Sequence, residues 1–282
     1  QRRGGRTVPE PVVGTALLEQ VANGVELNPA QAQMVTEMAT DDRQVQLCLA
    51  PAGSGKTTAM RVLANAWADN GGTVVGLAPS AAAATELAAS IGVPTDTLAK
   101  LVWHIRNGDE PEWMRAIGPD TLLLVDEAGM ASTADLAASI TYVTSRGGTV
   151  RLIGDDQQLA SVSAGGVLRE VAAEAGAVTL PELHRFTNQT EAANTLLLRN
   201  GDVEALGFLL DNQRVRVVGE AEAAHALHAA WAADVKAGKT ALMLALRPDQ
   251  VAMDRAAAGC TDPLSQVLDR LRRDGVRAVS PS

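Results

Sequence analysis

Short apolar runs along the chain alternate with longer segments in which apolar residues recur at three- and four-residue spacing. Apolar runs are typical of buried strands, and the longer period is typical of amphipathic helices. Helices are predicted at 57–69 and at 80–91, which Ser80 opens. Strands are predicted at 45–49, 73–78, 121–125, 149–153 and 177–180. Strands that alternate with helices favour a parallel sheet covered by helices, so the sequence predicts an α/β fold.

The pattern changes beyond Arg185. Helical stretches at 191–199 and 220–237 alternate there with short apolar runs at 215–218 and 241–245, which predict strands. The start of the chain is polar and punctuated by Gly and Pro, and it predicts either a linker or a weak helix. We therefore expect four parts, with the boundaries 1–26, 27–210, 211–258 and 259–282.

Composition is that of a globular protein. The 282 residues are 46% hydrophobic, and no apolar run approaches the roughly 20 residues that cross a bilayer. The start lacks the apolar core of a signal peptide, and the two distant cysteines, Cys48 and Cys260, indicate a reducing compartment rather than a disulfide framework. We therefore expect a cytoplasmic protein. The first residue is Gln1 rather than Met, which we interpret as a segment of a longer chain or an incomplete reading frame.

The charge balance argues against a free-standing electrostatic DNA binder. The chain has 24 Lys and Arg against 33 Asp and Glu, a net charge of −9, whereas neutralising phosphates takes clustered cations. Aromatic residues make up only 2%, which limits base stacking. One local groove could still bind nucleic acid, and an acidic, alanine-rich enzyme surface also explains this composition.

Residues 50–58 read Ala-Pro-Ala-Gly-Ser-Gly-Lys-Thr-Thr and match the phosphate-loop pattern Gly/Ala-x-x-x-x-Gly-Lys-Ser/Thr. Small residues let successive N–H groups point at one centre, where a β-phosphate fits, and the following helix adds its positive dipole end. Lys56 supplies a mobile charge for the β- and γ-phosphates, and the Thr57 hydroxyl can ligate Mg²⁺. A chance Gly-rich turn is the alternative, but the strand before and the helix after it argue against that. The nucleotide is expected to contact Ala52, Gly53, Ser54, Gly55, Lys56, Thr57 and Thr58.

A second chemical signal, Asp126-Glu127-Ala128, directly follows the apolar run at 122–125. Carboxylates at the carboxyl end of a central strand lie where open α/β sheets bind ligands. Asp126 is placed to hold Mg²⁺ through its water shell, and Glu127 to polarise the water that attacks the γ-phosphate. Alone, the pair could simply be two acidic residues that open a loop. Together with the phosphate loop it predicts hydrolysis and disfavours a small-molecule kinase, which does not need to activate water.

A third element, Gly154-Asp155-Asp156-Gln157-Gln158-Leu159, comes after the next strand. The three elements in this order resemble those of superfamily 1 DNA helicases of the RecD-like branch, and more closely the helicase part of MobF-class conjugative relaxases. The resemblance covers about residues 27–258. It implies a RecA-like lobe that binds ATP and Mg²⁺, and it assigns to Gln158 the sensing of the γ-phosphate and its coupling to the DNA site.

Two further segments extend the resemblance. Residues 27–31, Leu-Asn-Pro-Ala-Gln, are similar to the adenine-recognition element, with Gln31 placed to bond the donor and acceptor edges of adenine. Asn28 and Pro29 also fit a simple helix start. Residues 183–186, Leu-His-Arg-Phe, resemble the element whose arginine reaches the γ-phosphate. Arg185 is therefore the candidate for stabilising transition-state charge, and a solvent-exposed arginine is the alternative.

Two hydroxyl side chains are candidates for contact with DNA. Ser80 and Thr97 lie in segments with which helicases of this kind touch the single-strand backbone. A hydroxyl side chain can also cap the first amides of a helix, and this is the alternative for both residues. Helix capping and DNA contact are therefore both open for these residues.

The resemblance ends within the second RecA-like lobe that members of the family contain. Residues 240–251 resemble its opening, but Met253-Asp254 replaces the family's Leu-Asn pair. Neither a Thr-x-His-x-x-Gln-Gly nor an Ala-x-Ser/Thr-Arg element occurs in the sequence. Residues 262–275 instead predict an amphipathic helix, which resembles the segment C-terminal to the helicase in these relaxases. We interpret this as an internal deletion. A three-histidine relaxase site is also absent from the sequence, and the only tyrosine, Tyr142, lies in a predicted helix.

The prediction is an α/β, RecA-like P-loop lobe with a parallel sheet and a truncated second α/β remnant. Two functions stay open: a DNA-stimulated helicase motor or a piece of one, and a degenerate nucleotide-binding module without helicase activity. The expected cofactors are ATP and Mg²⁺. The expected partners are weakly bound single-stranded DNA and a full-length relaxase or other conjugation proteins.

Overall fold

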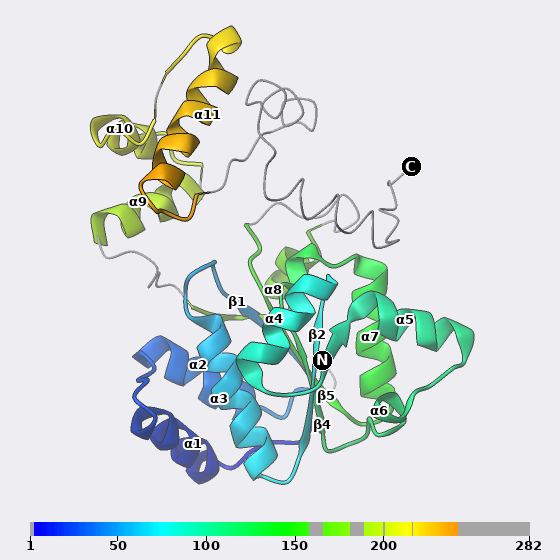
Figure 1. The fold of residues 1–282 in the computed structure, drawn as a ribbon. Coiled ribbons are helices and arrows are strands. Elements are labelled where there is room, and N and C mark those ends of the chain that lie inside the picture. The colour runs from blue at the N-terminus through cyan, green and yellow to red at the C-terminus, as the bar shows by residue number, and fades with distance from the viewer. Residues whose placement is uncertain (1–2, 158–165, 181–188, 200, 216, 242–282) are drawn as a thin grey trace. The chain divides into compact units, whose positions relative to one another are not determined.

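A computed structural model describes residues 3–157, 166–180, 189–199, 201–215 and 217–241 of the chain. The chain divides into two compact units, Gln1–Ala205 and Leu206–Ser282. The first unit contains a sheet with helices on both faces (Figure 1). The second unit contains helices in its described part.

The six-stranded sheet of the first unit has the order β3-β2-β4-β5-β1-β6, and every pairing in it is parallel. This confirms the predicted α/β fold and parallel sheet. The five predicted strands are present to within a residue or two at their ends, and the short strand β3 was not predicted. The strands are β1 (Val45–Leu49), β2 (Thr73–Ala78), β3 (Thr95–Thr97), β4 (Thr121–Val125), β5 (Thr149–Gly154) and β6 (Val178–Thr179).

Alternate residues of the central strands supply two separate cores. Leu122 and Leu124 of β4 pack into one core, and Leu123 and Val125 pack into the other. Because successive side chains of a strand point to opposite faces, the unbroken run of buried residues in β4 requires helices on both sides of the sheet. One face carries α1 (Glu10–Ala22), α2 (Pro29–Thr40), α3 (Lys56–Asp69) and α4 (Ala81–Ile91). The other carries α5 (Leu98–Asn107), α6 (Glu112–Arg115), α7 (Thr133–Ser145) and α8 (Val167–Ala175).

The start of the chain is a helix packed on the first core. Val13 and Ala16 of α1 are buried there. Ahead of the helix, Arg6 pairs with the Asp120 carboxylate and donates to the Asn70 carbonyl. Of the linker and the helix that the sequence pattern allows for 1–26, the structure therefore contains the helix.

A buried arginine binds the backbone of the segment that connects α2 to β1. The Arg151 guanidinium donates to the backbone carbonyls of Met38, Asp41, Arg43 and Val150 at 2.8–3.2 Å. Its side chain is completely buried on β5, and burial lowers its pKa to about 10, which leaves it charged at neutral pH. Since its acceptors are main-chain atoms, this side chain fixes the backbone at the amino end of the sheet.

The last helix of the first unit is α9 (Gln189–Arg199), and α10 (Glu204–Asp211) spans the boundary. The second unit also contains α11 (Glu220–Lys236), close to its predicted bounds. The predicted strand at 215–218 is wrong: Val215, Val217 and Val218 have no regular structure and are exposed. An apolar run forms a strand only where another strand pairs with it, and the described part of this unit supplies none.

The predicted strand at 241–245 lies outside the described residues apart from Ala241, and the predicted helix at 262–275 lies wholly outside them. The same holds for most of the expected second-lobe opening. Within the described ranges, no helix is both long enough and apolar enough to cross a membrane.

Candidate functional site

The carboxyl ends of β1, β5 and β4 bring the predicted chemical elements to one edge of the sheet. Ala50, which follows β1, donates its N–H to the Gly154 carbonyl at the end of β5 at 2.9 Å. Asp126, which follows β4, donates its N–H to Leu77 O at 3.0 Å. These bonds continue the parallel ladders one residue past the strands. They place the loop 50–55, the Asp126-Glu127 pair and the Gly154-Asp155 turn beside one another.

The loop between β1 and α3 has the backbone of an anion cradle. Gly53 and Gly55 have φ of 86° and 74°, which glycine adopts without the steric penalty that other residues carry. Ser54 N–H bonds Pro51 O at 3.1 Å and closes the turn. Among the described residues, no carbonyl accepts from the amides of Gly53, Gly55, Lys56 or Thr57. Open amides at a helix N-terminus attract a phosphate.

Two further observations fit a nucleoside triphosphate with a metal ion. The Ser54 hydroxyl is buried and has no hydrogen-bond partner in the described part of the chain. Thr57, at the start of α3, and Asp126 are both partly buried. No group of three or more His, Cys, Asp or Glu side chains in the described ranges could hold a metal alone.

Lys56 is buried between two carboxylates. Its Nζ lies 3.0 Å from Asp126 Oδ1 and 2.5 Å from Glu127 Oε1, and its side chain is 10% exposed. Burial by itself would lower the pKa of Lys56, but Asp126 and Glu127 outweigh burial and raise it. The lysine is therefore charged at neutral pH, and its charge is balanced by side chains that can rotate away from it.

Glu127 has a backbone conformation that is rare for a residue with a side chain. Its φ of 50° and ψ of 37° are left-handed, and its N–H bonds the preceding Asp126 Oδ1 at 2.8 Å. Such a conformation costs on the order of 1–3 kcal/mol and persists only where the surroundings impose it. Here it places the two consecutive carboxylates of Asp126 and Glu127 on the same ammonium group.

Gln31 contacts the phosphate loop directly. Asn28 and Gln31 form a capping box at the start of α2: Gln31 N–H bonds Asn28 Oδ1, and Asn28 N–H bonds Gln31 Oε1. The Gln31 Nε2 also donates to the Ser54 carbonyl at 2.8 Å. The helix start that Asn28 and Pro29 indicate is therefore present, and the contact with the loop was not predicted.

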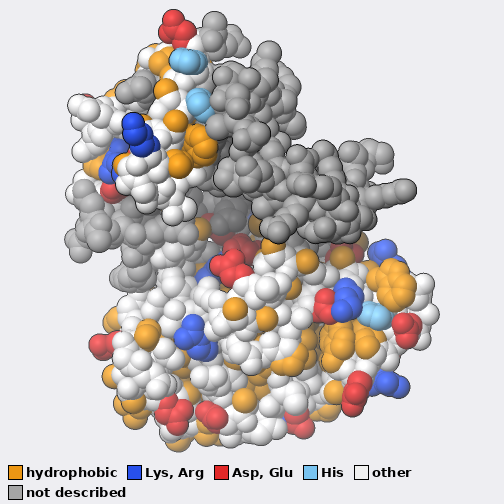
Figure 2. All heavy atoms as spheres, viewed as in Figure 1, with side chains coloured by type: hydrophobic (Ala, Val, Ile, Leu, Met, Phe, Trp, Pro, Cys, Tyr) orange, Lys and Arg blue, Asp and Glu red, His pale blue; other side chains and the backbone are white. Residues whose placement is uncertain are grey.

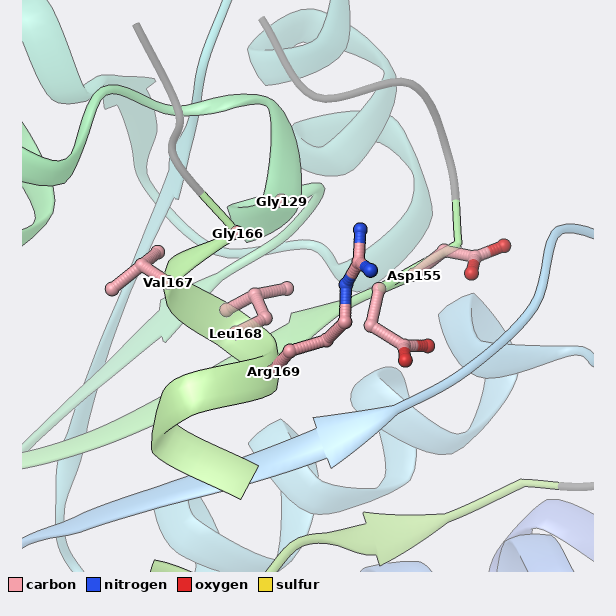
Figure 3. Close-up of a pocket in the computed structure, with 7 residues that line it drawn as sticks. Gly129, Asp155, Gly166, Val167, Leu168 and Arg169 are labelled. Carbon is pink, nitrogen blue, oxygen red and sulfur yellow. The ribbon is translucent and has the colours of Figure 1, made fainter. Parts of the chain in front are cut away.

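The third predicted element is described only in part. Asp155, at the end of β5, is buried and accepts from Gln157 N–H at 3.0 Å. Figure 3 shows Arg169 of α8 extending toward this turn, beside a shallow pocket that Asp155, Asp156 and Gly129 also line. Arg169 was not predicted, because it belongs to no motif. Gln158 and Arg185 lie outside the described residues, so their roles stay predictions.

The two hydroxyl residues considered for DNA contact cap helices. Ser80 Oγ accepts from Ala83 N–H, and Thr97 Oγ1 accepts from Lys100 N–H, both at 3.2 Å. The capping alternative is thus present for both residues. Contact of these residues with DNA stays a prediction.

Comparison with known proteins relates this chain to a family described as an AAA domain, to conjugation proteins and to a DNA helicase. The profile of a family described as an AAA domain matches residues 26–220. The chain is 34% identical over 205 residues to the conjugal transfer protein TraA of Agrobacterium fabrum, covering 70% of the chain and 18% of that protein. It is 31% identical over 198 residues to the multifunctional conjugation protein TraI of Escherichia coli, covering 67% and 10%.

A third relative is the ATP-dependent RecD2 DNA helicase of Deinococcus radiodurans, 32% identical over 185 residues, which covers 64% of the chain and 25% of the helicase. The chain spans no more than a quarter of the length of these three relatives. Among solved structures, the Pif1 helicase from Candida albicans superimposes with a TM-score of 0.50 at 17% identity, covering 70% of this chain and 50% of that one. This likeness shows the fold alone, an α/β, RecA-like lobe.

Proposed function

This chain belongs to the AAA domain family and is related to RecD-like superfamily 1 helicases and conjugative relaxases, and we propose that it binds ATP with Mg²⁺ and hydrolyses ATP as part of a relaxase-helicase. The observation that supports this most is the position of Lys56. It lies at the open N-terminus of α3 and within hydrogen-bond distance of both Asp126 and Glu127. The residues proposed as the phosphate-binding charge, the metal-binding carboxylate and the general base are therefore in contact with one another.

Each residue of this site has a proposed role. The loop 52–58 binds the phosphates through its amides, and Lys56 leaves its carboxylate partners to contact the β- and γ-phosphates. The Thr57 hydroxyl and Asp126 would hold Mg²⁺, which supplies charge stabilisation when bound. Glu127 polarises the attacking water once Lys56 no longer neutralises it. From the family resemblance, Gln158 senses the γ-phosphate and Arg185 stabilises transition-state charge.

The proposed partners are single-stranded DNA and a full-length relaxase or another conjugation protein, met in the cytoplasm. On the face drawn in Figure 2, the Lys and Arg side chains of the described residues form small groups, and most of these groups have an acidic side chain beside them. With the net charge of −9, this supports weak binding to DNA, because affinity for the backbone grows with the number of phosphates neutralised.

A second candidate function is a nucleotide-binding module that turns over slowly and does not unwind DNA. It applies to a chain made of residues 1–282 alone, because the two late helicase elements do not occur among them. A motor of this class steps by closing a cleft between two lobes. An arginine supplied across a cleft can contribute about 10³–10⁵ in rate.

Steady-state ATP hydrolysis with and without single-stranded DNA tests the proposal, and strand displacement on a tailed duplex separates the two candidates. DNA-stimulated hydrolysis that Glu127→Gln abolishes would support an ATPase. Hydrolysis without displacement would favour the module. A wild-type chain that binds no nucleotide would refute both.

A further inference from the structure

The amide of Gln31 joins the start of α2 to the middle of the phosphate loop. Only 7% of Gln31 is exposed, and its two amide atoms have different partners. Oε1 accepts the Asn28 N–H at 3.0 Å, and Nε2 donates to the Ser54 carbonyl at 2.8 Å. The first bond is local to the helix. The second reaches 23 residues along the chain to the loop that would hold a nucleotide.

The bond to Ser54 O has a geometric consequence for the loop. In a planar trans peptide unit, the C=O of one residue and the N–H of the next point in opposite directions. Fixing the Ser54 carbonyl toward Gln31 therefore directs the Gly55 N–H away from Gln31. Gly55 N–H is one of the loop amides that no described carbonyl accepts from, so Gln31 sets the direction of a phosphate-binding donor.

Gly55 is fitted to the same contact. A Cβ atom at Gly55 would overlap Gln31 Nε2, and the φ of 74° at this position disfavours a side chain independently. The close approach of the amide to the loop backbone thus needs a glycine at that position. The second loop glycine, Gly53, provides the other left-handed turn of the loop.

We propose that Gln31 is a positioning residue for the nucleotide phosphates: it holds the Ser54–Gly55 peptide in the phosphate-binding orientation. This inference rests on the proposed nucleotide binding and deepens it. It assigns to the residue an effect that is the same for every ligand with the same phosphate chain, whatever base that ligand carries.

Calorimetric titration of the Gln31→Met chain with ATP, GTP and inorganic tripolyphosphate, each with Mg²⁺, tests the inference. Methionine keeps the length of the side chain but cannot donate to Ser54 O. We expect the affinities for all three ligands to fall by a similar factor of about five, the scale of one hydrogen bond. Asn28→Ala is the matched control, because it removes the cap of α2 but leaves the Gln31–Ser54 bond. Its affinities should stay at the wild-type level.

Hydrogen exchange of the loop amides in the ligand-free protein gives a second measurement. Gln31→Met should speed exchange in residues 52–56, and Asn28→Ala should not. If Gln31→Met weakened the binding of ATP but not of GTP or tripolyphosphate, Gln31 would act on the base. If Gln31→Met and Asn28→Ala had equal effects, the role of Gln31 would be helix capping. Either result overturns the inference, and so does unchanged affinity of Gln31→Met for all three ligands. A wild-type chain that binds none of the three ligands would instead refute the proposed function.

Discussion

Lys56 and Arg151 are two buried cations near opposite edges of the same sheet, and their surroundings differ. Lys56, at the carboxyl edge, lies between two carboxylate side chains, whereas the Arg151 guanidinium, on β5 toward the amino edge, is bound by backbone carbonyls alone. Side-chain partners can exchange for an incoming phosphate while the backbone stays in place. Carbonyl partners cannot be exchanged without moving the main chain. Lys56 is therefore suited to binding a ligand, and Arg151 is suited to stabilising the fold.

The largest expected effect is on stability, at the amino edge. Arg151→Met should lower the free energy of unfolding by about 3 kcal/mol or more, because several buried carbonyls lose their donor and each costs roughly 1–3 kcal/mol. Urea denaturation measures it, with Arg115→Met at an exposed position as the control. A variant of wild-type stability that no longer binds nucleotide would reverse the comparison and make Arg151 a functional residue.

At the carboxyl edge the expected loss is catalytic. Glu127→Gln should lower the ATP turnover about 10²-fold, the usual scale for losing a general base. The affinity for ATP with Mg²⁺ should stay at or slightly above the wild-type value, because a neutral amide competes less with the phosphates for Lys56. Steady-state kinetics and calorimetry separate the two quantities. Asp126→Asn should instead change the Mg²⁺ dependence, and turnover as fast as wild type in Glu127→Gln would exclude the hydrolytic role.

Lys56→Ala should weaken ATP binding tenfold or more, since a charge-assisted bond to phosphate contributes roughly 1.5–3 kcal/mol. Lys56 is one of four lysines in the chain, so few neighbours could replace it. Lys100→Ala is the matched control, because Lys100 is half-exposed and pairs only locally with Asp96. Calorimetry that finds equal affinity in Lys56→Ala and wild type would remove the phosphate-loop assignment.

The sequence predicts local motifs such as those around Lys56, but it does not show whether an apolar run finds a strand to pair with. The loop 50–58 and the Asp126-Glu127 pair are local motifs that follow buried apolar runs, and such runs become strands when other strands pair with them. Strand β3 is made of Thr95, Asp96 and Thr97 and carries no apolar run. The run at 215–218 carries one but has no strand to pair with in the described part of its unit.

Contacts between distant segments were beyond the sequence pattern. The bond from Gln31 to the Ser54 carbonyl depends on how α2 packs beside the loop, and the carbonyl acceptors of Arg151 depend on where the α2–β1 connection crosses β5. Neither can be deduced from residue type, because backbone carbonyls are the same at every position. Gln158 and Arg185 rest on family resemblance and remain predictions.

The smallest expected effect concerns pH and the carboxyl edge. Asp126 and Glu127 raise the pKa of Lys56 above its ordinary value of 10.5 despite burial. A cation with a raised pKa in the folded state contributes its stability below the unfolded pKa and loses it as pH rises through the folded pKa. In Glu127→Gln one of the two carboxylates is gone, so the variant should lose less stability above the unfolded pKa than wild type, and its loss should be complete at a lower pH. Urea midpoints from neutral pH to about 11.5 should run parallel below about pH 10 and then converge, because wild type loses more stability than the variant, by less than about 1 kcal/mol for partly exposed carboxylates. Curves of the same shape over the whole range would mean that Glu127 does not hold Lys56 in solution, and the two cations would then differ less than their contacts indicate.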